Sequence, residues 1–229
     1  MEVEDTLSMA TIHCLGDSHT EAFRHASTLR TWENTSFEFC IVPGASAMRA
    51  INPNSGINAQ HVIVDYLKLV SHDDTLLFCL GEVDCGFIIW YRAMKHPELS
   101  VNELFELSLR HYLDLIDGLI KEGFKKFIVT SASLPTIMDG QDWGEVANAR
   151  KEVKTPLRDR VNLALKFNDR LSQYRRRGLR YLGYDNEILD PLSGLVRAEF
   201  MNSNKLDHHL EPSGIAPVLV EKLMGLGYK

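Results

Sequence analysis

The chain has 229 residues, of which 45% are hydrophobic, and it carries a formal net charge of −6 at pH 7. This length and this hydrophobic content suffice for one sizeable core, so we expect a single domain over residues 1–229. The acidic balance argues against nucleic acid as the main partner, because the binding of phosphates needs a basic face.

The sequence carries no signal for secretion or for a membrane span. Residues 1–10 are acidic and lack the apolar core of a signal peptide, and no apolar run approaches the length of a span. Buried free thiols are favoured over a disulfide framework or a cysteine zinc site, because no CxxC pair is present and the cysteines lie in or beside apolar runs. They are Cys14, Cys40, Cys79 and Cys85. We therefore expect a cytoplasmic protein.

Short apolar or β-branched runs alternate with segments of helical periodicity. The strand-like runs cover residues 11–15, 37–42, 75–80, 126–130 and 179–182. The helix-like segments cover residues 21–29, 60–70, 101–122, 157–175 and 213–226. Strands that alternate with helices indicate parallel strands joined by crossovers. We therefore expect an α/β fold, namely a three-layer α/β/α sandwich around a mainly parallel five-stranded sheet.

The polar segment 136–154 interrupts this alternation. Two interpretations stay open for it, a lid over a site and an exposed connection between elements. Apart from this segment, the chain shows no repeat, no low-complexity region and no linker. In sheets of the expected type, ligands bind beyond the carboxyl ends of the strands, so the residues that follow each strand are the candidates for a site.

The stretch Gly16-Asp17-Ser18-His19 follows the first predicted strand and precedes the first predicted helix. If Ser18 lies at the strand exit, its hydroxyl is at the ligand-binding edge of the sheet. The amide N–H groups at the start of the next helix favour a developing oxyanion at the same place. A structural alternative is a helix N-cap, a position for which Ser and Asp are both preferred.

The segment just before the last predicted helix contains Asp207, His208 and His209. A serine nucleophile needs a base that takes its proton and a carboxylate that orients the base. The C-terminal loop of an α/β sheet can fold back over the exit of the first strand and supply both groups. The alternative is a surface loop with solvated histidines.

Four blocks in the expected order resemble the SGNH, or GDSL-type, hydrolase superfamily. Gly16-Asp17-Ser18 resembles the GDS block, Gly44 the glycine block after the second strand, and residues 81–84 (GEVD) take the place of the GxND block. His209 begins HLEPSG, which resembles the C-terminal histidine block. The blocks extend from residue 12 to residue 214, nearly the whole chain. The resemblance implies the flavodoxin-like SGNH hydrolase fold.

The resemblance also implies a function and the residues that carry it. Ser18 would be the nucleophile, His209 the base and Asp207 the carboxylate that orients the base, with His208 pointing elsewhere. The backbone N–H groups of Ser18 and Gly44 would form part of the oxyanion hole. The implied activity is that of a serine esterase or acylhydrolase that cleaves a small acyl ester, with an O-acetyl group on a carbohydrate as one candidate. No cofactor is implied.

Two departures from the family pattern bear on this activity. Val83 stands where the family has an asparagine whose side-chain amide completes the oxyanion hole, and losing one such donor typically costs on the order of 100- to 1000-fold in rate. A loop asparagine such as Asn54 is a candidate replacement. The carboxylate usually lies three residues before the histidine, whereas Asp207 lies two before His209. Residues i and i+2 of an extended segment point to the same side, so the pair can still meet.

Three further residues near the predicted strand exit are candidates for contact with a small-molecule or glycan ester. Glu82 either meets substrate hydroxyls or forms structural pairs. Asp84 either meets substrate or holds a loop by accepting backbone N–H bonds, and Trp90 either stacks on a sugar ring or packs in the core. The sequence does not indicate an oligomeric state.

Two other functions are weighed against the esterase. Val83 is compatible with a catalytically degenerate relative that binds a glycan or an acyl group without turnover. A metal-dependent phosphoesterase is suggested by DHH at residues 207–209 and faintly by GDSH at residues 16–19. Such enzymes need further Asp and His blocks to hold two metals. The chain has no D-x-D or D-x-H motif before Gly16 and no GNHD-like block, so we expect no metal.

Overall fold

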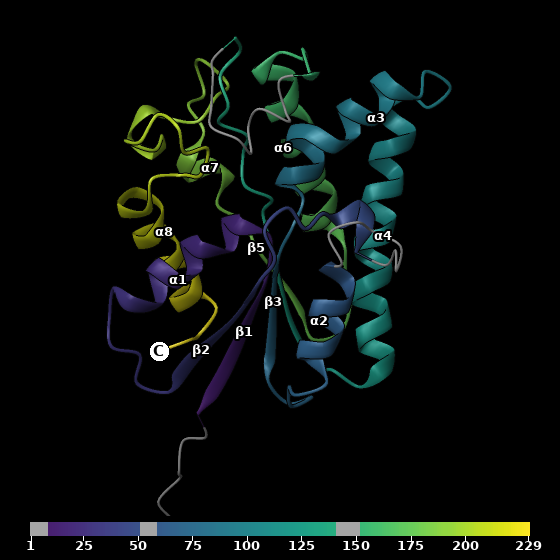
Figure 1. Cartoon of the computed structure of the whole chain (residues 1–229). Coiled ribbons are helices and arrows are strands. Elements are labelled where there is room, and N and C mark those ends of the chain that lie inside the picture. The colour runs from purple at the N-terminus through teal and green to yellow at the C-terminus, as the bar shows by residue number, and fades with distance from the viewer. Residues whose placement is uncertain (1–8, 51–58, 141–151) are drawn as a thin grey trace, which may run out of the picture.

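The computed structural model describes residues 9–50, 59–140 and 152–229, and its centre is a sheet of five parallel strands (Figure 1). Across the sheet the strands are β2 (Thr35–Ile41), β1 (Ala10–Gly16), β3 (Thr75–Cys79), β4 (Lys126–Thr130) and β5 (Leu179–Leu182). All five lie on the predicted runs. Because β1 lies between β2 and β3, the residues after these three strands share one edge of the sheet.

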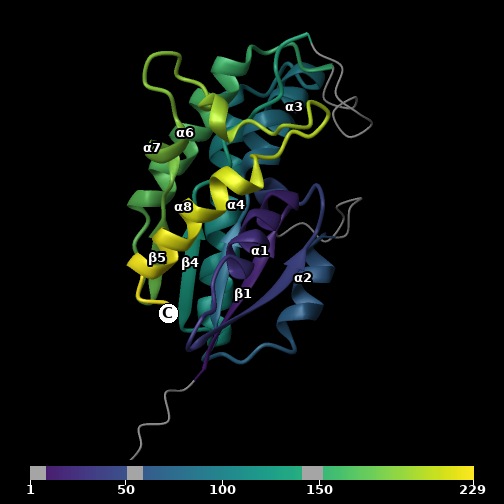
Figure 2. The ribbon, with the colours of Figure 1, turned by 90° about the vertical axis from the view of Figure 1, so that its left-hand side faces the viewer.

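Helices cover both faces of the sheet (Figures 1 and 2). One face carries α1 (Glu21–Thr28) and α8 (Pro212–Gly225), which pack against each other. The other carries α2 (Ala59–Leu67), α4 (Val101–Glu122) and α6 (Leu157–Gln173). The expected three-layer α/β/α sandwich is therefore confirmed. Among the described helices, none combines the length and the apolar character that a bilayer crossing requires.

The strands that lie inside the sheet are mostly buried. All five residues of β3 are buried, which is typical of parallel strands covered by helices on both faces. The four cysteines are buried and unpaired, as their positions in apolar runs indicated.

Helix α4 has the bounds that its sequence predicted, because both of its ends carry strong local signals. Ser100 and Glu103 form a reciprocal capping box in which the backbone N–H of each residue donates to the other side chain, at 2.8 and 3.2 Å. At the other end Gly123 adopts a left-handed conformation with φ of 109°, a common way for a helix to stop.

The sequence did not predict the helical elements that follow β3 and β5. After β3 the chain forms a π-helical turn, η3 (Asp84–Ile88), that continues into α3 (Ile89–Lys95). After β5 it forms the short helix α7 (Asp185–Ile188). In η3, Gly86 makes room for the Glu82 side chain, since a Cβ atom there would lie 2.5 Å from Glu82 Oε1. The turn thus holds a carboxylate at the sheet edge.

The start of the polar segment 136–154 packs against α6. Thr136 and Ile137 are buried, and Arg160 donates to the Ile137 carbonyl at 2.7 Å and to Asp139 at 2.9 Å. This part of the segment is therefore attached to the body of the protein. Residues 141–151 lie outside the described residues, so the choice between a lid and a connection stays open for them.

A first expected result concerns Gly16, the last residue of β1. A Cβ atom at Gly16 would lie 2.0 Å from the Cys79 carbonyl oxygen of the neighbouring strand. We expect Gly16→Ala to lower the free energy of unfolding by about 3 kcal/mol or more, the upper range for overpacking of a core. Urea denaturation followed by circular dichroism measures this change.

The matched control is Gly118→Ala in the C-terminal part of α4. A Cβ atom there would meet no described atom within 4 Å, so only helix propensity changes. We expect this variant to gain about 0.5–1 kcal/mol. If Gly16→Ala behaved like Gly118→Ala, the close approach of β1 to β3 at the site would be incorrect.

Candidate active site

Ser18 lies where the chain leaves β1 and turns into α1. It begins η1 (Ser18–Thr20), a single 3₁₀ turn, and Asp17 caps this turn by accepting the His19 backbone N–H at 2.8 Å. The two interpretations of the GDSH stretch, a helix cap and a serine hydroxyl at the ligand-binding edge, are therefore compatible. Asp17 is the cap, whereas the Ser18 hydroxyl turns toward the C-terminal loop.

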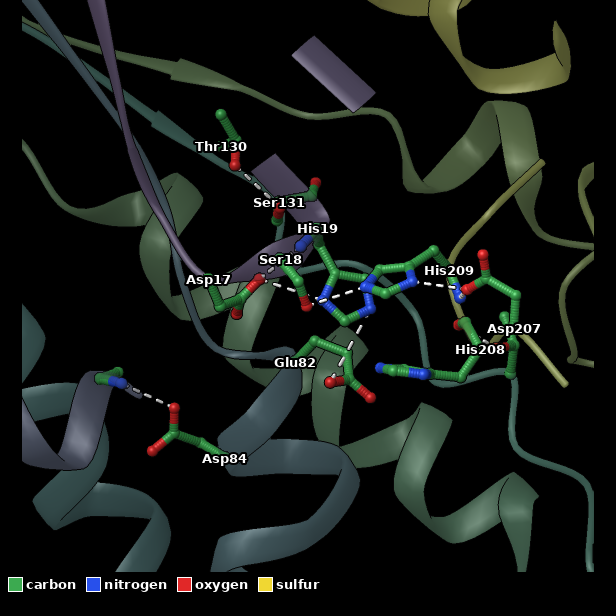
Figure 3. A network of polar contacts seen from close by, with 12 residues as sticks. Asp17, Ser18, His19, Glu82, Asp84, Thr130, Ser131, Asp207, His208 and His209 are labelled. Carbon is green, nitrogen blue, oxygen red and sulfur yellow. Dashed lines mark hydrogen bonds and ion pairs between the residues drawn. The ribbon is translucent and has the colours of Figure 1, made fainter. Parts of the chain in front are cut away.

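Ser18, His209 and Asp207 form a continuous chain of hydrogen bonds (Figure 3). Ser18 Oγ lies 2.8 Å from His209 Nε2, and His209 Nδ1 lies 2.6 Å from Asp207 Oδ1. The same carboxylate oxygen accepts the His209 backbone N–H at 2.9 Å. The Asp207 side chain thus accepts from the backbone of the residue two positions later, as in an Asx turn. The two-residue spacing between Asp207 and His209 therefore still brings the carboxylate and the ring together.

The C-terminal loop is held over the exit of β1 by contacts on both sides of the histidines. Met201 pairs with Leu210 in an antiparallel bridge, and the Glu211 N–H donates to the Phe200 carbonyl at 2.9 Å. The Thr136 hydroxyl donates to the His208 carbonyl. Helix α8 follows at once and packs on α1, the helix that begins beside Ser18. The loop is therefore docked through the same pair of helices that covers this face of the sheet.

The protonation states of His209 and Asp207 suit a base and the carboxylate that orients it. Burial lowers the pKa of His209, and the neighbouring His19 lowers it further, against the opposing effect of Asp207. Burial alone raises the pKa of Asp207, but the hydrogen bonds from the backbone and ring of His209 outweigh it, so the net pKa is lowered. At neutral pH the carboxylate is then ionised and the ring neutral. Nδ1–H donates to Asp207, and the lone pair of Nε2 faces the Ser18 hydroxyl.

Gly44 and Val83 lie at the ends of the strands that flank β1. Gly44 has a left-handed φ of 76° in the turn after β2, and the nearby Val42 N–H donates to the Gly16 carbonyl at 2.9 Å. The Val83 side chain is buried in the hydrophobic core and offers no hydrogen-bond donor. Asn54, the proposed replacement donor, lies outside the described residues.

A cavity of about 320 Å³ opens in front of the Ser18 hydroxyl and the His209 ring. Its wall combines apolar side chains with several polar ones. Besides Ser18, Asp207 and His209, the polar residues that line it are His19, Glu21, His25, Ser133, Tyr184 and Asn202.

Solved structures of similar architecture align with nearly the whole chain at low identity. A protein described as a candidate platelet-activating factor from Streptococcus pneumonia is 14% identical, with 98% of this chain and 87% of that chain covered and a TM-score of 0.60. A candidate SGNH hydrolase from Slackia heliotrinireducens is 13% identical, with coverage of 94% and 100% and a TM-score of 0.53. An acetyl xylan esterase is 12% identical, with coverage of 94% and 98% and a TM-score of 0.51.

The chain has the SGNH-hydrolase fold. No protein-family model matches the sequence, and no curated protein matches it. The SGNH fold was nevertheless predicted from four short blocks, and the structure places Ser18, Gly44 and Gly81 after three adjacent strands, as that prediction required.

Two residues that we expected to contact substrate are placed elsewhere in this SGNH fold. Asp84 is fully buried, and its carboxylate accepts the N–H groups of Ala47 and Met48 and the Ser108 hydroxyl, at 2.7, 2.9 and 2.9 Å. Burial raises the pKa of Asp84 to about 6. The expectation of substrate contact is therefore corrected, because these bonds make Asp84 the group that holds the turn after β2.

Trp90 is likewise engaged with the protein itself. Its indole N–H donates to the Cys85 carbonyl at 2.7 Å, and its ring packs against the core. It is not among the residues that line the cavity in front of Ser18. This placement favours the packing interpretation over sugar stacking.

Glu82 and two histidines complete the polar surroundings of the candidate site. Glu82 is only 2% exposed, and its Oε2 lies 3.9 Å from His19 Nε2. His19 Nδ1 lies 3.0 Å from Asp17 Oδ1. The His208 ring lies beside the His209 ring, with centroids 4.2 Å apart, and it is His209 that takes the position facing Ser18. Sequence reasoning missed His19, although its position directly after Ser18 was a usable signal.

Proposed function

We propose that the protein is a serine esterase of the acylhydrolase type, with Ser18 as nucleophile, His209 as base and Asp207 as the group that orients the base. The observation that carries this proposal is the chain of hydrogen bonds from Ser18 through His209 to Asp207, at 2.8 and 2.6 Å. The first distance lies in the range that a nucleophile and its base require, and the second joins the base to the carboxylate that orients it. The SGNH-hydrolase fold supports the same reaction class.

In this reaction the Ser18 oxygen attacks the carbonyl carbon of the ester while His209 Nε2 takes the hydroxyl proton. The imidazolium that forms is stabilised by the Asp207 carboxylate. When the tetrahedral intermediate collapses, the bond to the alcohol oxygen breaks and His209 returns the proton to that oxygen. Water, activated by His209, then attacks the acyl-serine and releases the acid.

The negative charge of the tetrahedral intermediate needs preorganised donors. The backbone N–H groups of Ser18 and Gly44 are the proposed donors, since both lie at the carboxyl edge of the sheet. Val83 adds no side-chain donor. A missing donor typically lowers the rate by on the order of 100- to 1000-fold, so we expect modest turnover unless a residue outside the described ranges supplies one.

We propose a small acyl group on a polar alcohol as the substrate class, with an O-acetyl group on a carbohydrate as the leading example. A cavity of about 320 Å³ suits a short acyl chain, and its polar wall suits a hydroxylated alcohol. The structural similarity to an acetyl xylan esterase supports the same choice.

A panel of p-nitrophenyl esters from acetyl to dodecanoyl tests the proposal, together with labelling by a fluorophosphonate probe. We expect measurable turnover that falls as the acyl chain grows, and covalent labelling located on Ser18 by mass spectrometry. Preference for long chains would overturn the substrate class. Absence of both turnover and labelling would overturn the esterase.

The pH profile follows from the lowered pKa of His209. The neutral ring is the active form, so kcat/KM rises as the ring loses its proton, with a midpoint below the ordinary histidine value of about 6.5. Rates for the acetyl ester, measured from about pH 4 to pH 8 in the presence of a chelator, check this. Circular dichroism at each pH shows that the fold persists, and a midpoint above the ordinary value would contradict the buried environment of the ring.

A second candidate is a binding protein that has lost catalysis, and the buried, donor-free Val83 favours it. The two candidates differ at Ser18. An activated serine reacts with the fluorophosphonate, whereas a degenerate site binds an acetylated oligosaccharide without labelling or turnover. Isothermal titration with the intact oligosaccharide, run beside the labelling assay, separates them.

A further inference from the structure

Three histidine rings from two distant segments meet beside Ser18. The centroid of the His19 ring lies 5.5 Å from that of His208 and 4.7 Å from that of His209, and the His208 and His209 centroids are 4.2 Å apart. One ring nitrogen from each histidine can be chosen so that all three lie within 4.8 Å of one another. His19 and His208 are at most 9% exposed.

Carboxylates fix the orientation of two of these rings. Asp17 Oδ1 lies 3.0 Å from His19 Nδ1, and Asp207 Oδ1 lies 2.6 Å from His209 Nδ1. A carboxylate that accepts Nδ1–H leaves the lone pair of Nε2 available, and metal-binding histidines usually donate their other ring N–H to such a partner. In both rings Nε2 faces the middle of the cluster, as Figure 3 shows.

The charges around the rings favour a cation. Three carboxylates, those of Asp17, Glu82 and Asp207, contact or approach the histidines. Asp17 and Glu82 are 1% and 2% exposed, so water screens their charges little. Among the described residues that line the adjoining cavity, none is a lysine or an arginine.

We propose that His19, His208 and His209 bind Zn²⁺, with Glu82 as the fourth ligand, and that the bound ion switches off Ser18. Three imidazoles and a carboxylate suit a tetrahedral site for this ion. Zn–N bonds of about 2.0–2.1 Å place ligand nitrogens about 3.3 Å apart, so the rings have to move inward by small rotations. Glu82 Oε2 is already 3.9 Å from His19 Nε2.

The inhibitory effect follows from His209 Nε2, and this second part rests on the proposed esterase function. The Nε2 lone pair faces the Ser18 hydroxyl at 2.8 Å and can accept either the serine proton or the metal ion. While Zn²⁺ occupies it, Ser18 has no base and is not activated. Removal of the ion by a chelator restores the hydrogen bond.

Metal binding is tested without reference to activity. The full chain, stripped with a chelator and dialysed, is titrated with Co²⁺ while the absorption bands of a tetrahedral ion are recorded, and Zn²⁺ is then added to displace the cobalt. We expect one ion per chain. His208→Gln should weaken binding at least tenfold, while thermal unfolding in chelator shows that the variant is folded.

His96→Gln is the matched control. His96 is exposed and pairs with a carboxylate, since its Nδ1 lies 3.3 Å from Glu98 Oε1, but it lies outside the cluster. We expect this variant to bind Co²⁺ as the wild type does. Equal loss in both variants, or no tetrahedral bands in the wild type, would overturn the site.

Fluorophosphonate labelling of Ser18 tests the switch, with each variant compared with itself in chelator and in Zn²⁺. We expect Zn²⁺ to suppress labelling of the wild type at least tenfold, to suppress it much less in His208→Gln, and to be reversed by chelator. Binding of cobalt with unaffected labelling would overturn the switch alone. Binding of cobalt by a chain that labels under no condition would overturn the esterase and leave the metal site standing.

Discussion

Replacing Ser18 with alanine is expected to lower the turnover of a small acyl ester by on the order of 10⁴- to 10⁶-fold and to abolish labelling by fluorophosphonate. The hydroxyl oxygen is the atom that attacks the ester, and no other hydroxyl is hydrogen-bonded to His209 among the described residues. The fold should survive, because only one oxygen is removed and Asp17 supplies the cap of the turn. Initial rates on p-nitrophenyl acetate, with intact-mass analysis of the labelled protein, measure both effects.

Ser27→Ala is the matched control for this substitution. Ser27 lies in α1, close to Ser18 in the chain, and its exposed hydroxyl donates to the Arg24 carbonyl at 2.8 Å. Its loss should leave turnover and labelling within about twofold of the wild type, as for most surface changes. If Ser18→Ala kept a tenth of the turnover while its unfolding midpoint stayed at the wild-type value, Ser18 would not be the nucleophile.

The second large effect is expected for His209→Gln, and it should not add to the first. Without the base, the Ser18 proton has no acceptor, so turnover should again fall by on the order of 10⁴- to 10⁶-fold. Groups that act as a unit lose their joint effect when either is removed. The double variant Ser18→Ala/His209→Gln should therefore be no slower than the slower single variant. Rates of the three variants on one ester, in chelator, measure the coupling.

His96→Gln again provides the control, since it removes an exposed imidazole that also contacts a carboxylate. It should change turnover by less than twofold. If the losses of the two single variants instead multiplied in the double variant, Ser18 and His209 would act independently. The hydrogen bond between Ser18 and His209 would then make no joint contribution to the rate.

The sheet could be predicted because its strands correspond to short apolar or β-branched runs in the sequence. Residues 126–130 and 179–182 match β4 and β5 residue for residue, since turn and polar residues bound both runs. The π-helical turn Asp84–Ile88 was not predictable in the same way. Its conformation depends on Gly86 leaving space for Glu82, a contact between side chain and backbone that local periodicity does not encode.

The meeting of Ser18 with the C-terminal loop was predictable from topology, because both follow elements that end at one edge of the sheet. The role of Asp84 was not predictable from the sequence. An aspartate that follows a strand looks the same in the sequence whether its carboxylate faces a substrate or the amides of a loop. Only the N–H groups of Ala47 and Met48 decide between these. The cluster around His19 depends on ring orientations that Asp17 and Asp207 determine. Such orientations emerge only from the packed structure.

The separation of Ser18 from its base also bears on the order in which the protein is made. The two residues are 191 positions apart, and the loop that carries His209 is docked by α8, which follows it. At 5–20 residues per second, a ribosome needs roughly 10–40 s to pass from one to the other. Throughout that interval the nascent chain exposes a serine that has no partner to activate it. The reactive centre is therefore assembled only at a late stage of synthesis, when all five strands of the sheet have already been translated.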